Sequence, residues 1–216
     1  MKSETRKSVA IIVAHPDDET LWAGGTILSH PEWNCFVVCL SRSSDNDRAP
    51  RFYNAMKELR AEGVMGDIDD GPEQHLLNEN EIENEILKLL PKSHYYLIIT
   101  HNEAGEYTRH RRHEEVNRAV VKLWRTGKIS ASELWTFAYE DGNAKYFPKA
   151  VENATFYQKL PEEIWQCKRN IITGTYGFTE NSWETETTPL AEAFWQFKDS
   201  QKAKIRLNKT EPDEKE

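Results

Sequence analysis

Three largely apolar runs constrain the fold of this chain more than any other feature of its sequence. They occupy residues 9–14, 35–40 and 95–100, and each is about as long as one strand of a sheet. A strand that is apolar at nearly every position, rather than at alternate positions, is buried on both faces, which is typical of a parallel sheet covered by helices. We therefore predict that these runs are central strands of one sheet.

The segments between the runs have the features of helices and shorter strands. Helices are predicted over 18–29, 51–62, 79–90, 114–124, 162–172 and 191–201, and further strands over 64–68 and 134–139. This alternation predicts an α/β fold with a doubly wound, mostly parallel sheet, right-handed crossovers and helices on both faces. We expect a single domain over residues 1–201, because 216 residues suffice for one such domain, and a charged, frayed tail over 202–216.

The composition excludes several classes of protein. Lys and Arg number 28 against 36 Asp and Glu, a net charge of −8, which argues against binding to nucleic acid or to an anionic membrane. No apolar run approaches the roughly 20 residues of a membrane span, and the run at 9–14 is too short for a signal peptide. Three cysteines cannot form a disulfide framework or a Cys-rich zinc site, and they fit a cytoplasmic location.

A dense group of charged residues follows the first predicted strand. The sequence HPDDE at 15–19 combines one His with three carboxylates, which repel one another unless a cation or a proton screens them. His nitrogen and Asp oxygen suit zinc, with other divalent first-row metals as alternatives. The competing interpretation is an acidic helix N-terminus, in which these carboxylates only cap the helix and favour its dipole.

A second group follows the 95–100 strand and includes His110 and His113. Their HxxH spacing is weak evidence alone, but ligands in such sheets bind beyond the carboxyl ends of the strands, so residues 15–19, 41–47 and 101–113 should converge. A catalytic zinc needs three protein ligands, which His15, Asp18 and one His of the pair would supply. One carboxylate of the first group then remains as a base, and the other His remains to stabilise charge or protonate a leaving group. These are the parts that metal-assisted hydrolysis of an amide requires.

Together the two groups resemble a known family. HPDDE, followed by AGGTI at 23–27, is similar to the signature of the PIG-L/LmbE-like zinc-dependent N-deacetylases, and THNEAGEY at 100–107 with the later HxxH resembles their second motif. The resemblance covers residues 8–140 and leaves 141–201 as a variable part. It implies a Rossmann-like fold, one zinc ion, and removal of an acetyl group from an N-acetylated amino sugar of the N-acetylglucosamine type or a glycoconjugate.

The resemblance also implies roles for individual residues. His15, Asp18 and His113 would be the zinc ligands. Asp17 would be the general base, and His110 would face the developing oxyanion and the leaving amine.

Two further carboxylates are expected behind these groups. Glu19 would hold a ligand or the first turn of its helix, and Glu106 would support the second motif. The family often has Pro-Asp between the two His, where this chain has Arg111 and Arg112. These cations should disfavour a charged imidazole at His110, and we expect Glu106 to offset that effect.

Three residues are candidates for substrate contacts: Arg51, Asp70 and Arg112. Arg51 begins the second predicted helix, but Asn54 stands where the family usually has a Glu partner for it. Asp70 lies where the family often has an acidic residue near the sugar, with a plain turn residue as the alternative. Arg112 either favours an anionic substrate or is simply solvated.

Other functions stay open from the sequence alone. The chain could be a metal-dependent amidase acting on another amide or on a thiol conjugate, or a non-catalytic module that binds a sugar or a metal. Trp183, Phe194 and Trp195 could stack on sugar faces, although core or subunit contacts are favoured. The expected partner is a small-molecule or glycoconjugate substrate. A homo-oligomer is left open, since assemblies are common among similar proteins.

Overall fold

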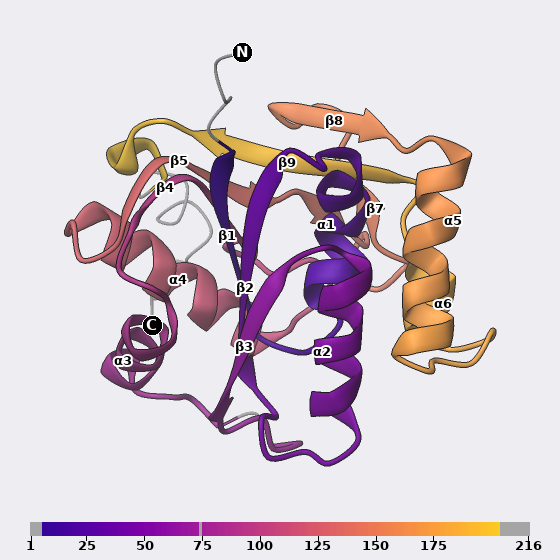
Figure 1. Ribbon diagram of the computed structural model, residues 1–216, viewed down its shortest axis with the longest axis horizontal. Coiled ribbons are helices and arrows are strands. Elements are labelled where there is room, and N and C mark those ends of the chain that lie inside the picture. The colour runs from indigo at the N-terminus through magenta and orange to yellow at the C-terminus, as the bar shows by residue number, and fades with distance from the viewer. Residues whose placement is uncertain (1–5, 74, 204–216) are drawn as a thin grey trace.

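The computed structural model describes residues 6–73 and 75–203, and these residues form a seven-stranded sheet in the order β3-β2-β1-β4-β5-β9-β8 (Figure 1). Five neighbouring strands are parallel: β1 (Lys7–Val13), β2 (Trp33–Ser41), β3 (Glu62–Ile68), β4 (His94–Thr100) and β5 (Ser130–Phe137). Two antiparallel strands, β9 (Ala191–Phe197) and β8 (Phe156–Lys159), extend the sheet beyond β5. A separate small sheet pairs β6 (Tyr139–Glu140) with β7 (Lys149–Ala150).

Helices cover both faces of the sheet (Figure 1). One face carries α1 (Asp18–Ser29), α2 (Arg48–Glu58), α5 (Glu162–Asn170), the π-helical turn η1 (Ile171–Thr175) and the short α6 (Trp183–Thr187). The other face carries α3 (Glu79–Leu89) and α4 (Arg111–Arg125). In β1, Val9 and Ile11 pack into the first core and Ala10 and Ile12 into the second. This two-sided burial explains the unbroken apolar run and confirms the predicted doubly wound α/β fold.

Residues 191–201, predicted as a helix, are mostly the strand β9, so that prediction is wrong. Phe194 is fully buried and pairs with Phe137 of β5 on one side and Phe156 of β8 on the other. The edge of β5 offers unpaired backbone groups, and the chain satisfies them by adding a strand. The long-range pairing of β9 with β5 and β8 outweighs the local preference for a helix, and this pairing cannot be recognised from the segment's own sequence.

Glu192 of β9 ties the antiparallel edge to α1. Its fully buried carboxylate accepts hydrogen bonds from the backbone N–H of Gly25 at 2.8 Å and of Thr26 at 2.6 Å, and it pairs with the buried Lys168 at 2.7 Å. A side chain at Gly25 would meet Leu160 at 2.4 Å. The glycine at position 25 therefore permits close packing of α1 on its neighbours, and this packing fixes the helix that begins at the site.

Boundaries of the second helix also differ from the prediction. It runs over 48–58 rather than 51–62, and the chain has already entered β3 at Glu62, so Gly63 lies in a strand and does not end the helix. A Cβ at Gly63 would lie 2.9 Å from Phe52 and Met56, so this position is a close approach between α2 and β3.

Three further expectations concern the ends of the chain, membranes and cysteines. Of the predicted tail at 202–216, the structure describes two residues, and Ala203 is buried in the second core; residues 204–216 lie outside the described part. None of the described helices is long and apolar enough to cross a membrane. Cys35 and Cys39 are buried and Cys167 is exposed, and all three are free thiols.

Candidate metal centre and active site

Polar residues from four parallel strands meet at the carboxyl edge of the sheet. His15 and its neighbours follow β1, Arg42 follows β2, Asp70 follows β3, and His101 follows β4. These four strands run parallel to one another, so their carboxyl ends lie along the same edge of the sheet. Residues from the segments 15–19, 41–47 and 101–113 lie together at this edge, as expected. Asp70, which follows β3, lies there as well.

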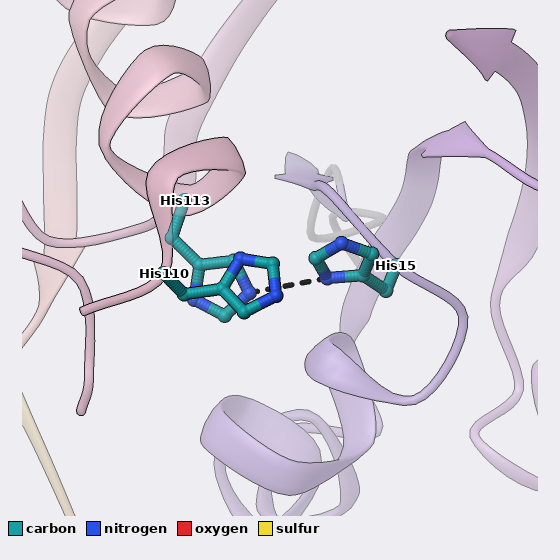
Figure 2. Close-up of side chains that lie close together, drawn as sticks. All are labelled: His15, His110 and His113. Carbon is teal, nitrogen blue, oxygen red and sulfur yellow. Dashed lines mark hydrogen bonds between the residues drawn. The ribbon is translucent and has the colours of Figure 1, made fainter. Parts of the chain in front are cut away.

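Three side chains at this edge place one donor atom each in a small triangle. His15 Nδ1 lies 3.1 Å from Asp18 Oδ2 and 3.1 Å from His113 Nε2, and the third side, His113 Nε2 to Asp18 Oδ2, is 3.4 Å. Figure 2 shows the imidazoles of His15 and His113 pointing at each other from the turn after β1 and the first turn of α4. Donors about 2.0–2.1 Å from a tetrahedral zinc lie about 3.3 Å apart, so the triangle fits such an ion.

The turn at 15–18 is shaped by its own hydrogen bonds. Asp18 Oδ2 also accepts from the backbone N–H of His15 at 2.9 Å, and Asp18 Oδ1 accepts from Trp22 Nε1 at 3.0 Å. Burial opposes ionisation of Asp18, but the neighbouring His113 and His101 outweigh it and hold the pKa of Asp18 well below its ordinary value. The carboxylate is therefore fixed in position and ready to accept a cation.

Glu106 stands behind the second motif. Its Oε2 lies 2.5 Å from His113 Nδ1 and 3.0 Å from His101 Nδ1, and its Oε1 accepts from the backbone N–H of Asn102. Burial opposes its charge, yet the two imidazoles lower the pKa of Glu106 to about 2. A carboxylate on the far nitrogen orients a histidine and raises its basicity as a metal ligand. Glu106 thus lies on the side of His113 that faces away from the triangle, and its role behind a metal ligand stays a prediction.

His101 lies close to the triangle, but both of its ring nitrogens already contact other groups. Its Nε2 accepts a hydrogen bond from the backbone N–H of Ala14 at 2.9 Å, and its ring stacks on His113 with centroids 3.9 Å apart. Asp18, His101 and His113 form a second group with metal-compatible spacing. Because the Ala14 N–H already uses the Nε2 lone pair, His101 is better suited to supporting β1 and His113 than to ligation.

His110 is stacked on His113 with centroids 4.3 Å apart and meets His15 edge-on at 4.6 Å (Figure 2). Its Nδ1 is buried without a hydrogen-bond partner among the described residues. Burial, and then the neighbouring His113 and His15, lower the pKa of His110 to about 3. The expected offset by Glu106 is not found, because that carboxylate is bonded to His101 and His113.

Asp17 faces the cavity beside the triangle, with its backbone at φ 124°. Glu19 Oε2 accepts from the Asp17 backbone N–H at 3.2 Å, and Glu19 Oε1 accepts from Tyr176 Oη at 2.7 Å. Glu19 therefore stabilises the start of α1 through the backbone of Asp17. Burial, then the charges of Asp18 and Glu19, raise the pKa of Asp17 well above its ordinary value.

Two of the three predicted substrate contacts, Arg51 and Arg112, do not line the cavity. Arg112 is fully buried and bonds to the backbone carbonyls of Asp69 and His75 and to Glu115, so it neither lines the cavity nor is solvated. Arg51 bonds to Asp47 and to the Tyr176 carbonyl, also outside the cavity lining.

Asp70 does line the cavity, but its carboxylate is engaged by the protein. Oδ1 lies 3.0 Å from His15 Nε2, and Oδ2 accepts from Arg42 Nε at 2.8 Å. Arg51 and Arg112 turn away from this cavity because their partners lie far away in the sequence, whereas Asp70, which the family resemblance placed near the sugar, is part of the cavity wall.

A cavity of about 370 Å³ opens beside the triangle, and the sequence singled out some of its wall residues but not the two arginines. Its walls include Arg42, Arg48, Tyr107 and Trp183. Trp183 meets Tyr107 with ring centroids 4.6 Å apart and stays 37% exposed, so it is a cavity wall rather than core. The polar loop at 41–47 indicated a contribution from Arg42, and Arg48 follows it as the first residue of α2. Nothing in the sequence predicted α6 or its position beside the site.

The chain matches a family model and a viral relative. The model described as PIG-L: GlcNAc-PI de-N-acetylase matches residues 10–124, which include both histidine motifs. The uncharacterized protein L374 of Acanthamoeba polyphaga mimivirus is 23% identical over 187 residues, covering 79% of this chain and 76% of that protein.

Solved structures share the fold at low identity. N,N'-diacetylchitobiose deacetylase from Pyrococcus horikoshii is 15% identical with a TM-score of 0.67, over 88% of this chain and 84% of that one. GalB, the 4-carboxy-2-hydroxymuconate hydratase of Pseudomonas putida KT2440, is 16% identical with a TM-score of 0.61, over 88% and 95%. These likenesses establish the fold, which in itself does not determine the reaction.

Proposed function

The chain belongs to the PIG-L family, and on that premise we propose that it is a zinc-dependent hydrolase that removes an acetyl group from an N-acetylated amino sugar or glycoconjugate. The family is described by its GlcNAc-PI de-N-acetylases, which supports deacetylation as the reaction class. The observation that carries the proposal is the triangle of His15, Asp18 and His113, with sides of 3.1, 3.1 and 3.4 Å.

These three residues would hold the metal. Two imidazole nitrogens and one carboxylate oxygen form a donor set found at catalytic zinc sites, and three protein ligands leave one position for water or substrate. When bound, zinc supplies a Lewis acid for the amide carbonyl and acidifies a water molecule. Glu106 behind His113 and the buried setting of Asp18 support the choice of these ligands.

Two cavity residues are suited to the proton transfers. Asp17 makes no hydrogen bond to the triangle and faces the cavity, so its carboxylate can take a proton from the attacking water. His110 presents a buried Nδ1 that lacks a partner among the described residues. A hydrogen bond from this ring to the developing oxyanion, or to the departing amine, would satisfy it.

The remaining walls are suited to a sugar. The rings of Trp22, Tyr107 and Trp183 form an aromatic side, and Arg42 and Arg48 form a polar side. Aromatic faces pack against the apolar face of a pyranose while polar groups orient its hydroxyls. A cavity of about 370 Å³ is of the size that holds a small ligand.

The alternative is another reaction on the same scaffold, on a different amide or a thiol conjugate. The likeness to a hydratase favours keeping this alternative, because GalB has the same fold. A non-catalytic module is disfavoured by the presence of Asp17 and His110 beside the triangle of His15, Asp18 and His113.

Metal analysis combined with an amine-release assay tests the proposal. We expect one zinc-class ion per chain and free amine from at least one member of a panel of N-acetylglucosamine, its phosphorylated form, and its lipid-linked and nucleotide-linked forms. Metal without amine release from any sugar, together with turnover of another amide or a thiol conjugate, would favour the alternative. A chain that binds no divalent metal would overturn the proposal. The cytoplasmic location and a homo-oligomeric state remain predictions.

A further inference from the structure

A carboxylate also stands behind the first predicted metal ligand, on the side away from the triangle. Asp70 Oδ1 lies 3.0 Å from His15 Nε2, while His15 Nδ1 faces Asp18 and His113. His15 therefore has one nitrogen turned to the triangle and the other turned to Asp70. This arrangement repeats the one at His113, whose Nδ1 meets Glu106.

Asp70 is itself held from two sides. Arg42 donates from Nε to Asp70 Oδ2 at 2.8 Å and approaches the same oxygen through Nη2 at 2.7 Å. The Asp70 side chain is only 8% exposed, although it lies at the cavity wall. Its position is thus set by the protein before any ligand enters.

The backbone of the Asp70 segment is anchored by the unusual arginine between the two histidines. Arg112 donates from Nε to the carbonyl of Asp69 at 2.6 Å and from Nη2 to the carbonyl of His75 at 2.9 Å. Its guanidinium is fully buried and also pairs with Glu115 on its own helix. Arg112 thus links the start of α4, which carries His113, to the loop after β3, which carries Asp70.

We propose that Asp70 is a positioning residue that orients His15 for metal binding, and that Arg42 and Arg112 hold it in place. The inference rests on the proposed metal site and deepens it. A carboxylate on the far nitrogen fixes the ring and the tautomer of the ligating histidine, and loss of such a partner typically weakens metal binding by roughly 10–100-fold. The role differs from the sugar contact expected from the sequence.

The zinc dissociation constant, measured by competition with a chelator, tests the inference without any substrate. We expect Asp70→Ala to raise it by roughly 10–100-fold, and Asp70→Asn, which keeps a hydrogen-bonding oxygen without the charge, to raise it less. Asp67→Asn is the matched control, because Asp67 is an acidic residue of the same segment that bonds to Ser44 outside the triangle. It should bind zinc like the wild type.

Kinetics at saturating zinc separate the two roles of Asp70. A positioning residue should leave KM for the substrate within about twofold, with activity at limiting zinc restored by added zinc. Wild-type zinc affinity in Asp70→Ala, with a raised KM, would overturn the inference and assign Asp70 to the sugar. An equal loss of affinity in Asp67→Asn would also overturn it.

Arg42→Gln is a second variant that leaves the core intact, because Arg42 is 42% exposed. It should weaken zinc binding in the same direction as Asp70→Asn, and by less. Failure of the wild type to bind zinc would overturn the proposed function together with this inference, whereas wild-type binding with unchanged affinity in both Asp70 variants would overturn this inference alone.

Discussion

The parallel strands from β3 to β5 and the antiparallel edge of β9 and β8 are built in different ways. The centre of the parallel part, β1, β2 and β4, consists of largely apolar strands packed on both faces, and the carboxyl ends of β1, β3 and β4 lead into the histidines and carboxylates of the site. The antiparallel edge is held by a buried ion pair between Lys168 and Glu192, and the segment between its two strands brings Trp183 to the cavity.

This difference separates two tasks. The parallel part supplies the groups suited to chemistry, and the antiparallel part supplies packing for α1 and one wall of the cavity. Variants of the first part should therefore change metal content and kcat, and variants of the second should change stability and KM. The following experiments would break or sharpen that division.

The largest effect is expected for the metal ligands. His15→Ala and His113→Ala should each lose most of the bound metal and nearly all activity, because two ligands cannot retain zinc as three do. Elemental analysis and the amine-release assay measure the two effects. Full metal content in both variants would remove the triangle as the metal site.

Asp17→Asn should keep the metal and lose activity. The amide keeps the size of the side chain but cannot accept a proton, so kcat should fall by roughly 10²–10⁴, the range of a positioned acid–base group. Metal content and circular dichroism serve as controls for folding. Turnover at the wild-type rate would move the base elsewhere, with Glu19 and Glu106 next to test.

Lys168→Met should destabilise the fold with little change in kcat. It leaves Glu192 buried without its cation, and breaking one partner of a buried pair costs about 3–5 kcal/mol of unfolding free energy. Urea unfolding measures the change. The neighbouring Arg169→Met is the matched control: its ion pair with Glu180 lies at the surface, and its loss should cost about 1 kcal/mol or less. Equal costs for the two variants would contradict the role of the buried pair.

His110→Ala distinguishes the two histidines of the HxxH pair. It should keep its zinc and lose rate by roughly 10²–10³, as expected for a group that stabilises an oxyanion. Metal content compared with that of His113→Ala gives the answer without knowledge of the true substrate. Zinc loss in His110→Ala with retention in His113→Ala would reverse the assignment, and His15, His110 and His113 do form an alternative group with suitable spacing.

The smallest effect is expected for Trp183→Ala. Loss of a stacking face is worth about 0.5–1.5 kcal/mol, so KM should rise by up to roughly tenfold with kcat nearly unchanged. Trp183→Phe, which keeps an aromatic face, should recover most of the affinity. A loss of stability with no change in KM would instead show that Trp183 serves packing, which is the role that the sequence favoured.

The site was predictable where short stretches of sequence carry it. HPDDE directly follows β1, and HxxH begins α4 after the loop that follows β4. The approach of His15, Asp17, Asp18, His110 and His113 could therefore be expected from the parallel strands whose carboxyl ends lead into these segments. The supporting contacts were harder to predict. From the sequence, His101 was only part of the second motif and Asp70 was a candidate sugar contact. The local sequence does not show that His101 accepts from the Ala14 backbone N–H or that Asp70 contacts Nε2 of His15.

The sequence by itself determined the parallel core and the edge at which the chemistry is gathered, since a strand buried on both faces must be apolar throughout and its polar successors must lie at its end. Only the tertiary structure decided the rest. Residues 191–197 became a strand because the edge of β5 needed a partner, and Arg112 turned inward because the carbonyls of Asp69 and His75 were there to receive it. Both outcomes depend on groups far away in the chain, and backbone pairing and burial in the folded protein outweigh local preference.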